Sequence, residues 1–210
     1  MMKVVSLVSS GLDSPVATYL MSRFVDEIII VHADGRPFCD DSEMKNFETL
    51  VKKLVDVCEC NCKILSVSHG PVLQQYLSKG SSRFTCVFCK RMLLRYADEI
   101  CKRYDASAIV MGDSLGQVAS QTLKNIQTIE SVASYPILRP LIGFDKDDVV
   151  SWSRKLGLFE VSTLKGGSCR AVPDTPATEA KQDQITSEEA NLYIDSLIQS
   201  ALDSAVFLSV

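Results

Sequence analysis

The sequence predicts an α/β fold: an open, parallel, five-stranded sheet with helices on both faces, followed by a C-terminal helical extension. The first observation is a set of short, continuously apolar runs, of which residues 28–31 (Ile-Ile-Ile-Val) are the clearest. Strands without a polar face are typical of parallel sheets that helices cover on both sides. The second is that helical stretches separate these runs, as in βαβ units. The third is the length of 210 residues, which fits one domain with a small addition.

Each element is identified by its hydrophobic pattern. The expected strands are residues 3–8, 27–32, 63–68, 108–111 and 137–138. The expected helices are residues 16–24, a stretch from Ser42 onward, 71–77, 90–104, 117–131, 145–156, and a last helix that starts at a capping box at 186–189. In the helix after Ser42, apolar residues recur every three or four positions and form a core-facing stripe of Phe47, Leu50, Val51, Leu54 and Val55.

The composition indicates the compartment of the protein and the state of its cysteines. No apolar run approaches the roughly 20 residues of a membrane span, and the N-terminal residues lead directly into a strand without a signal peptide. We therefore expect a cytoplasmic protein whose eight cysteines are reduced. The net charge of −4 argues against a dedicated nucleic-acid binder. Residues 79–103 nevertheless hold seven Lys and Arg, whereas 174–203 hold seven Asp and Glu. A basic patch for a polyanion and two ordinary solvated helix faces both remain open.

The residues between the first strand and the first helix suit a phosphate. They read Ser-Ser-Gly-Leu-Asp-Ser, and we expect all six to bind a nucleotide: Ser9, Ser10, Gly11, Leu12, Asp13 and Ser14. Small residues let the backbone approach an anion, and the free N–H groups of the helix attract it. Asp13 can hold the magnesium that accompanies a nucleotide. The segment is neither a Walker P-loop nor a dinucleotide fingerprint. An ordinary capped connection is the alternative.

Further polar residues follow the other expected strands. Ligands of an open parallel sheet bind beyond the carboxyl ends of its strands. The nucleotide contacts expected there are His32, Ala33, Gly112, Asp113, Gln117, Gln121 and Arg139. The end of the second strand can contact an adenine through its backbone, and Asp113 and Arg139 can meet metal or phosphate. For His32, a catalytic base and a half-buried, hydrogen-bonded histidine are both open, and the second is favoured.

Seven of the eight cysteines fall into two groups. Cys86 and Cys89 stand at a helix start, where their spacing lets both thiolates face one metal, and Cys169 lies in a glycine turn that can reach the same sheet edge. Structural zinc normally takes four ligands, so three thiolates suit an iron–sulfur cluster better, although His69 or the loop at 58–62 could supply a fourth ligand. The second group is expected to pack as free thiols in the core: Cys58, Cys60, Cys62 and Cys101.

Longer motifs identify a family. Residues 9–14 resemble the PP-loop of ATP pyrophosphatases, usually written S-G-G-x-D-S, although Ser10 replaces the first glycine. The segments C-x-x-C-K-R-M at 86–92, G-x-S-L-G-Q-V-A-S-Q-T-L at 112–123 and L-R-P-L-I-G at 138–143 resemble the PP-loop domain of tRNA 4-thiouridine synthetases, also called thiamine-biosynthesis sulfurtransferases. The resemblance implies a fold of the adenine nucleotide alpha hydrolase type. It divides the chain into a PP-loop domain at 1–176 and a C-terminal tail and helix at 177–210.

The resemblance implies a two-step reaction. The O4 of a tRNA uridine, expected at position eight, attacks the α-phosphate of ATP and releases pyrophosphate; sulfur then attacks C4 and expels AMP. The cofactors it implies are ATP, magnesium and, as in archaeal-type members, an iron–sulfur cluster, with zinc as the alternative metal. The implied catalytic residues are Asp13, Cys86, Cys89 and Cys169; the three cysteines are also the implied metal ligands, and the expected tRNA contacts are Lys90, Arg91 and Arg95.

The sequence departs from the family pattern in lacking both the THUMP-containing tRNA-binding region and the rhodanese-like domain of some members. We therefore expect weak tRNA binding by this chain alone, a separate THUMP-type protein as partner and an external sulfur donor; a homodimer remains open. Two alternative functions are kept. The same ATP activation could serve a thiamine thiazole precursor or a nucleobase, or the chain could be a non-catalytic nucleotide-binding module with structural zinc. Conversion of ATP to AMP and pyrophosphate, and its stimulation by tRNA, would discriminate between them.

Overall fold

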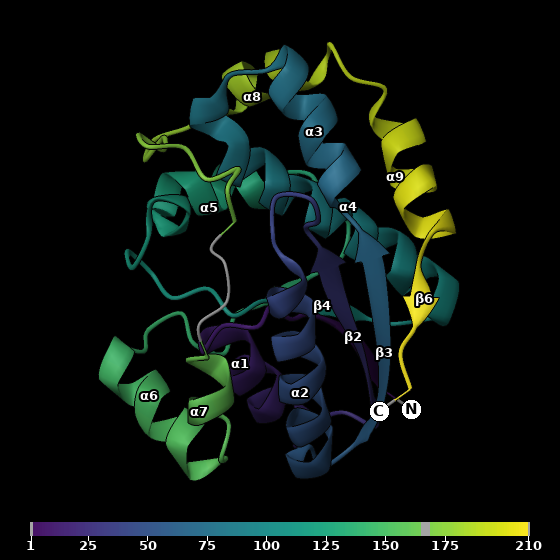
Figure 1. The fold of residues 1–210 in the computed structure, drawn as a ribbon, viewed down its shortest axis with the longest axis vertical. Helices are drawn as coiled ribbons and strands as arrows, with labels where there is room; N and C mark the ends of the chain where they lie inside the picture. The colour runs from purple at the N-terminus through teal and green to yellow at the C-terminus, as the bar shows by residue number, and fades with distance from the viewer. Residues whose placement is uncertain (1, 165–168, 210) are drawn as a thin grey trace.

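The computed structural model describes residues 2–164 and 169–209. Within them lies a six-stranded sheet with the strand order β5-β4-β1-β2-β3-β6 (Figure 1). The strands are β1 (Lys3–Leu7), β2 (Glu27–Asp34), β3 (Asn61–Ser68), β4 (Ala108–Val110), β5 (Ile137–Leu138) and β6 (Val206–Phe207). The first five run parallel, and β6 pairs antiparallel with the edge of β3. The expected α/β fold class is confirmed.

The expected number of five strands is wrong, because β6 adds a sixth. Two residues are too few to show a strand periodicity, so the sequence pattern contained no signal for β6. Its pairing with β3 depends on where the preceding helix delivers the chain, which is a tertiary property. Val206 and Phe207 are both exposed, and the Phe207 ring contacts Tyr104 edge-on with centroids 6.0 Å apart.

Helices cover both faces of the sheet. One face is covered by α1 (Asp13–Ser22), α2 (Asp41–Val57), α6 (Lys146–Lys155) and α7 (Phe159–Ser162). The other is covered by α3 (Gly70–Lys79), α4 (Thr85–Tyr104), α5 (Leu123–Glu130), α8 (Gln182–Glu189) and α9 (Ile194–Asp203). The apolar run of β2 serves both cores: Ile28 and Ile30 face the first group, whereas Ile29 and Val31 face the second. This alternation explains why the run has no polar face.

Two expected helices are interrupted. Residues 117–131 do not form one helix, because a short 3₁₀ turn at Ala119–Gln121 precedes α5. Thr122 caps α5 by accepting a hydrogen bond from the Asn125 N–H at 3.2 Å, which starts the helix at Leu123. The last expected helix is likewise two helices, α8 and α9, joined at 190–193. By contrast, Asp145 caps α6 as expected, in a reciprocal pair with Asp148.

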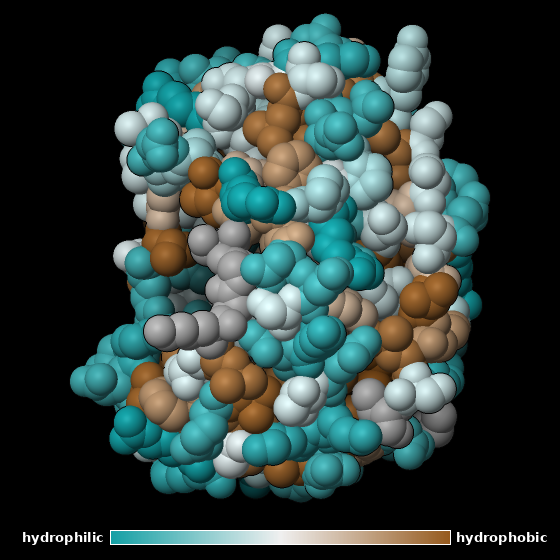
Figure 2. Space-filling view, viewed as in Figure 1, coloured by the Kyte–Doolittle hydropathy of each residue, from teal (hydrophilic) through white to brown (hydrophobic). Residues whose placement is uncertain are grey.

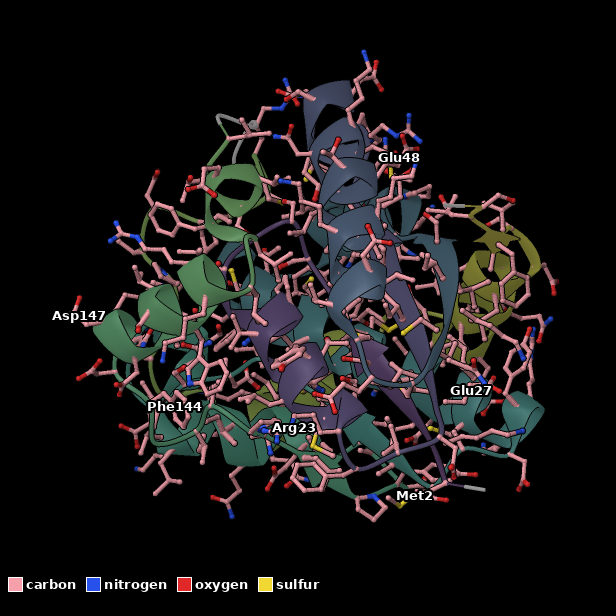
Figure 3. All side chains as sticks on the ribbon, turned by 90° about the horizontal axis from the view of Figure 1, so that it is seen from below. Met2, Arg23, Glu27, Glu48, Phe144 and Asp147 are labelled. Atoms are coloured by element: carbon pink, nitrogen blue, oxygen red, sulfur yellow. The ribbon has the colours of Figure 1, made fainter. Side chains whose placement is uncertain are left out.

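The face of the molecule drawn in Figure 2 is mostly hydrophilic. On the face shown in Figure 2, hydrophobic residues occur in small, separated groups, and charged side chains such as Glu48 and Asp147 project from the periphery (Figure 3). Among the described residues, no helix combines the length and apolar character that crossing a membrane requires.

The strand order places the site. β1 leads to β2 and β3 on one side, whereas β4 and β5 lie on its other side, so the order reverses between β1 and β4. At such a reversal the loops after the two strands diverge to opposite faces and leave a crevice at the carboxyl edge. The loop after β1 is the expected phosphate loop, and the loop after β4 begins with Gly112.

Candidate active site

The loop after β1 is held by its own serines. The Ser9 N–H donates to Ser14 Oγ at 2.9 Å, the two hydroxyls lie 3.2 Å apart, and the Gly11 N–H donates to Ser9 Oγ at 3.3 Å. α1 starts at Asp13, and within the described residues no side chain caps its N-terminus. Helix N-terminal N–H groups without an internal partner bind anions. The N-terminus of α1 is therefore suited to an anion.

Gly112 lets β4 approach this loop. A Cβ at Gly112 would lie 2.5 Å from both the Cα and the N of Ser14, closer than side-chain atoms pack. Any other residue would push the start of α1 away from the end of β4. The contact fixes the phosphate loop against the second loop of the crevice.

Asp113 is a buried hub of charge. It accepts a hydrogen bond from Lys90 Nζ at 2.6 Å, one from Arg139 Nε at 3.3 Å and one from Gln121 Nε2 at 3.4 Å. Burial raises the pKa of this carboxyl, but the nearby charges of Lys90 and Arg139 outweigh burial and hold the pKa below its usual range. Asp113 is thus ionised and committed to two cations, and its role in this structure is to position Lys90 beside the cavity.

Asp13 has a partner that the sequence did not suggest. Lys146 Nζ, from the first residue of α6, lies 2.7 Å from Asp13 Oδ1, and both side chains are partly exposed. The Lys146 ammonium balances the charge of the Asp13 carboxylate beside the loop that follows β1. The two residues are 133 positions apart in sequence, so only the packing of α6 beside α1 brings them together.

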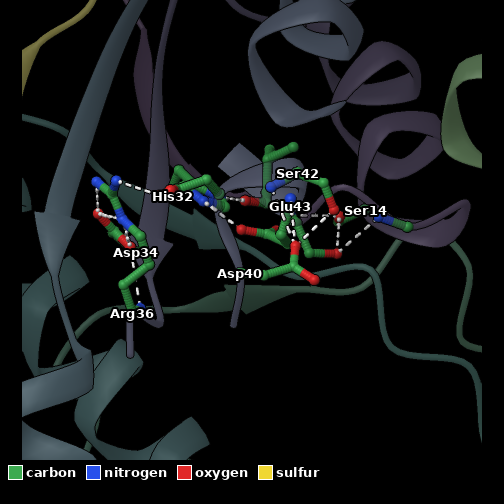
Figure 4. Close-up of polar contacts among 11 residues, drawn as sticks. Ser14, His32, Asp34, Arg36, Asp40, Ser42 and Glu43 are labelled. Atoms are coloured by element: carbon green, nitrogen blue, oxygen red, sulfur yellow. Dashed lines mark hydrogen bonds and ion pairs between the residues drawn. The ribbon is translucent and has the colours of Figure 1, made fainter. Parts of the chain in front are cut away.

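His32 is a buried, positioned residue. Its Nδ1 lies 3.1 Å from the Val8 carbonyl oxygen, its Nε2 lies 3.5 Å from Glu43 Oε2, and its ring stacks on Phe47 with centroids 3.8 Å apart (Figure 4). Only 2% of the residue is exposed. His32 is therefore fully buried and not half-buried as expected. Its Nδ1 has a hydrogen-bond partner, whereas among the described residues its Nε2 has none and lies near the Glu43 carboxylate.

One cavity unites the phosphate loop with thiols. Its volume is about 620 Å³, and its wall contains Ser9, Ser14, Cys39, Cys89 and Cys169. The other expected residues that line it are Ser10, Gly11, Asp13, His32, Ala33, Lys90, Gly112, Asp113 and Gln121. The expected residues outside its lining, among those described, are Leu12, Cys86, Arg91, Arg95, Gln117 and Arg139. Gln117 instead donates to the Phe144 carbonyl at 3.4 Å.

Cys39 lines the cavity, although no motif or spacing in the sequence singled it out. The hydrogen bond from Cys39 lowers the pKa of Cys169 to about 6, and raises that of Cys39. The loops carrying them are joined where the Arg170 N–H donates to the Phe38 carbonyl at 2.9 Å. The loop that carries Cys39 also packs closely against the first residue of α3, Gly70. A Cβ at Gly70 would lie only 1.7 Å from the Arg36 carbonyl oxygen.

The two cysteines of α4 lie in its first turns, as expected. Burial and the neighbouring thiols raise the pKa of Cys89 to about 12, and burial raises the pKa of Cys86. The nearby Cys169 raises the pKa of both thiols, and the positive charge of Lys90 lowers it. Cys89 Sγ also lies 3.2 Å from His69 Nε2. Within 2–164 and 169–209, no three His, Cys, Asp or Glu side chains already enclose a position for a single ion. Residues 166–168 of the expected glycine turn lie outside the described residues.

Arg91, an expected tRNA contact, is buried in an ion-pair cluster instead of lying on the surface. Arg91 is 3% exposed; its Nε and Nη2 each donate to Glu189 at 2.8 Å, and its Nη1 donates to the Thr128 carbonyl at 2.6 Å. Arg95 donates to the same carboxylate at 2.9 and 2.7 Å. Burial raises the pKa of Glu189, but hydrogen bonds from both arginines outweigh it and lower the pKa to about 2. These arginines attach α8 to α4 and are not displayed to a ligand.

The second cysteine group lies at the opposite end of β3 from the cavity. Cys58, Cys60 and Cys62 are partly buried and pack against the core beneath α2. A hydrogen bond with Cys58 raises the pKa of Cys62. Cys101 is fully buried, as expected.

Comparison with known proteins identifies the family of this chain. The sequence model of the family described as thiamine biosynthesis protein (ThiI) matches residues 1–194. The chain belongs to the ThiI family. A relative named probable tRNA sulfurtransferase, from Methanosarcina mazei, is 37% identical over 209 residues, which are 99% of this chain and 52% of the relative. The crystal structure of a 4-thiouridine synthetase–RNA complex with bound ATP matches with a TM-score of 0.93 and 27% identity, covering 99% of this chain and 55% of that one.

A more distant structure shares the fold alone. The U34-tRNA thiolase NcsA from Methanococcus maripaludis, described with its 4Fe-4S cluster, matches with a TM-score of 0.53 and 15% identity, covering 96% of this chain and 72% of that one. The chain spans about half the length of the curated ThiI relatives that it matches.

Proposed function

We propose that this chain is the ATP-activating and sulfur-inserting part of a tRNA 4-thiouridine synthetase. It adenylates O4 of a tRNA uridine, at position eight, and replaces that oxygen with sulfur, releasing AMP and pyrophosphate. The observation that carries the proposal is the single cavity whose wall contains both the phosphate loop and three thiols. ATP activation modifies the O4 of a uridine, and sulfur then attacks the C4 that carries this oxygen, so the nucleotide and a sulfur-carrying group must both reach one bound uridine. The names of the ThiI relatives support this assignment.

In this proposal, residues around the cavity divide into those that bind ATP and those that handle sulfur. The N–H groups at the start of α1 and the serines of its loop bind the phosphates, and Asp13 holds magnesium, releasing Lys146 to the triphosphate. Lys90, fixed by Asp113, adds positive charge beside the cavity. Cys169 has a thiol pKa of about 6 because of the Cys39 hydrogen bond, so it is a thiolate at neutral pH and suited to carry or receive sulfur.

The residue types also fit an iron–sulfur cluster. Soft thiolates are the donors such clusters require, and Cys86, Cys89 and Cys169 act on one another electrostatically beside the cavity. When bound, a cluster supplies a soft binding site for the transferred sulfur. Cys39, which lies beside Cys169, is a fourth thiol within reach. It revises the expectation that only His69 or the loop at 58–62 could add a ligand.

The RNA-binding surface must include more than this chain displays. The net charge is −4, and Arg91 and Arg95 are engaged by Glu189. We therefore expect a THUMP-type region or partner protein to provide most of the tRNA affinity, and an external donor to provide sulfur.

The experiment is an ATP cleavage assay with the purified chain. AMP and pyrophosphate should form in equal amounts, more rapidly with tRNA, and Asp13→Asn should abolish both while the circular dichroism spectrum is retained. Asp147→Asn, on the exposed start of α6, is the matched control. Cleavage that ignores tRNA but responds to a small carboxylate or thiazole precursor would replace the tRNA substrate with that compound. Undiminished cleavage by Asp13→Asn would remove the phosphate-loop assignment.

A further inference from the structure

His69 is a buried ring with a contact at each nitrogen. It is 2% exposed and stands directly between the last residue of β3 and the first residue of α3. Its Nδ1 lies 3.1 Å from the Tyr96 hydroxyl, and its Nε2 lies 3.2 Å from Cys89 Sγ. Its backbone N–H donates to the Asp34 carbonyl at 2.8 Å. The backbone of His69 is therefore anchored to β2, and its ring contacts two side chains of α4.

The partners are equally constrained. Tyr96 is fully buried, and its ring meets His69 edge-on with centroids 5.7 Å apart. Cys89 and Tyr96 are seven residues apart on α4, which is two turns, so they share one face of that helix. No rearrangement of a surface loop is needed to bring the three groups together. They form a continuous Tyr96–His69–Cys89 chain that leads from the core to the cavity wall.

A neutral imidazole carries one proton, so the three groups allow two arrangements. With Cys89 as a thiol, S–H donates to Nε2, and Nδ1–H donates to the Tyr96 oxygen. With Cys89 as a thiolate, the sulfur only accepts; Nε2 must then carry the proton, and the Tyr96 O–H donates to Nδ1.

We propose that Tyr96 and His69 are positioning residues that present an N–H donor to the Cys89 sulfur when that sulfur binds a metal centre. This inference rests on the proposed function in taking Cys89 as a metal ligand. Metal binding at Cys89 releases one proton to solvent: the thiol, Nδ1–H and hydroxyl protons become Nε2–H and the hydroxyl proton. The Nε2–H···S bond offsets the cost of a thiolate in a buried place and fixes the direction of the sulfur.

The first test reads the tautomer of His69 directly. The chain contains two histidines, so nitrogen-15 labelling of histidine gives two rings, and His32 is the internal reference because its Nδ1 faces the Val8 carbonyl in either state. Cadmium is a suitable diamagnetic probe that binds thiolates. We expect Nδ1–H at His69 in the metal-free protein and Nε2–H after cadmium binds, with His32 unchanged. Cadmium bound by Cys89 with the proton still on Nδ1 would overturn the inference.

The second test separates hydrogen bonding from packing. His69→Leu should weaken cadmium binding about 10–100-fold, the usual effect of losing an outer partner of a metal ligand. His69→Gln, which keeps an N–H donor, should recover most of the affinity. Tyr96→Phe should weaken binding, whereas the equally buried Tyr76→Phe should not, because the Tyr76 hydroxyl donates to the Ser81 carbonyl away from the thiols. Circular dichroism checks that each variant is folded.

The outcomes distinguish the inference from the proposed function. Equal loss of affinity in His69→Leu and His69→Gln would assign His69 a packing role and overturn the inference alone. Failure of the wild-type chain to bind cadmium through Cys89 would overturn the inference together with the metal assignment. Cleavage of ATP by the same preparation would show that the nucleotide part of the proposed function survives either result.

Discussion

Glu189→Gln should destabilise the protein severely, because it leaves a buried arginine without its counter-charge. Arg91 and Glu189 are 3% and 6% exposed, and Arg91 and Arg95 donate four hydrogen bonds of 2.7–2.9 Å to this one carboxylate. Removing one partner of a buried ion pair typically costs about 3–5 kcal/mol. That is a large part of the roughly 5–15 kcal/mol by which a domain of this size is stable.

Urea unfolding, followed by circular dichroism at neutral pH, measures the loss. Glu99→Gln is the matched control, since its pair with Lys102 is exposed and such pairs contribute at most about 1 kcal/mol. The double variant Arg91→Met with Glu189→Gln should recover part of the loss, because it removes the stranded charge. A loss below about 1 kcal/mol in Glu189→Gln would refute the structural role of this cluster.

The same variants decide between the structural role and an RNA-binding role for Arg91. In the structural role, Arg91→Ala lowers the unfolding free energy and leaves the salt dependence of tRNA binding unchanged under conditions where the variant is folded. In an RNA-binding role, the logarithmic salt slope falls by about 0.7–0.9 for each lost phosphate contact. A fall of that size with unchanged stability would return Arg91 to the RNA interface.

Three further results are expected. The pKa of Glu189 is lowered from 4.5 to about 2. Its contribution of about 3 kcal/mol to the free energy of unfolding is therefore complete above pH 4.5 and is lost as the pH falls toward 2. Acid unfolding curves should show this loss in the wild type and not in Glu189→Gln. Gly112→Ala places a Cβ 2.5 Å from Ser14 and should cost about 1–3 kcal/mol and weaken ATP binding, whereas Gly143→Ala, with open space around it, should do neither; equal calorimetric ATP affinities would contradict the close approach. Cys39→Ala removes the hydrogen bond that lowers the pKa of Cys169 to about 6, so the pH midpoint of Cys169 alkylation, measured by mass spectrometry, should rise; an unchanged midpoint would exclude that hydrogen bond as the cause.

Local patterns predicted the central sheet and the place of the site. Residues 28–31 have no polar position, which indicates a strand covered on both faces, and the two cores on either side of β2 confirm it. Because ligands bind at the carboxyl edge of a parallel sheet, the sequence alone predicted that residues 9–14 lie close to Gly112. These predictions succeeded because strand burial and loop position follow from the order of the elements, and that order is visible in the sequence.

Contacts between elements distant in sequence were not predictable in the same way. Lys146 reaches Asp13 across 133 residues, and His69 reaches Cys89 across 20. Cys39 had no spacing partner, since its neighbour Cys169 is supplied by a loop more than a hundred residues later. Each depends on how two helices or loops pack against the same sheet edge. A residue type alone shows what a side chain can bind, and only packing shows what stands beside it.

The charge pattern contained more information than its first interpretation used. Seven basic residues at 79–103 and seven acidic residues at 174–203 were weighed as a polyanion patch or as solvated faces. The structure gives a third outcome for part of both segments, because Arg91 and Arg95 from the first meet Glu189 from the second. A buried arginine requires a carboxylate as counter-charge. The acidic C-terminal segment supplies one, Glu189. The pairing packs residues 182–189 onto the helix that carries Cys86 and Cys89 and stabilises that helix.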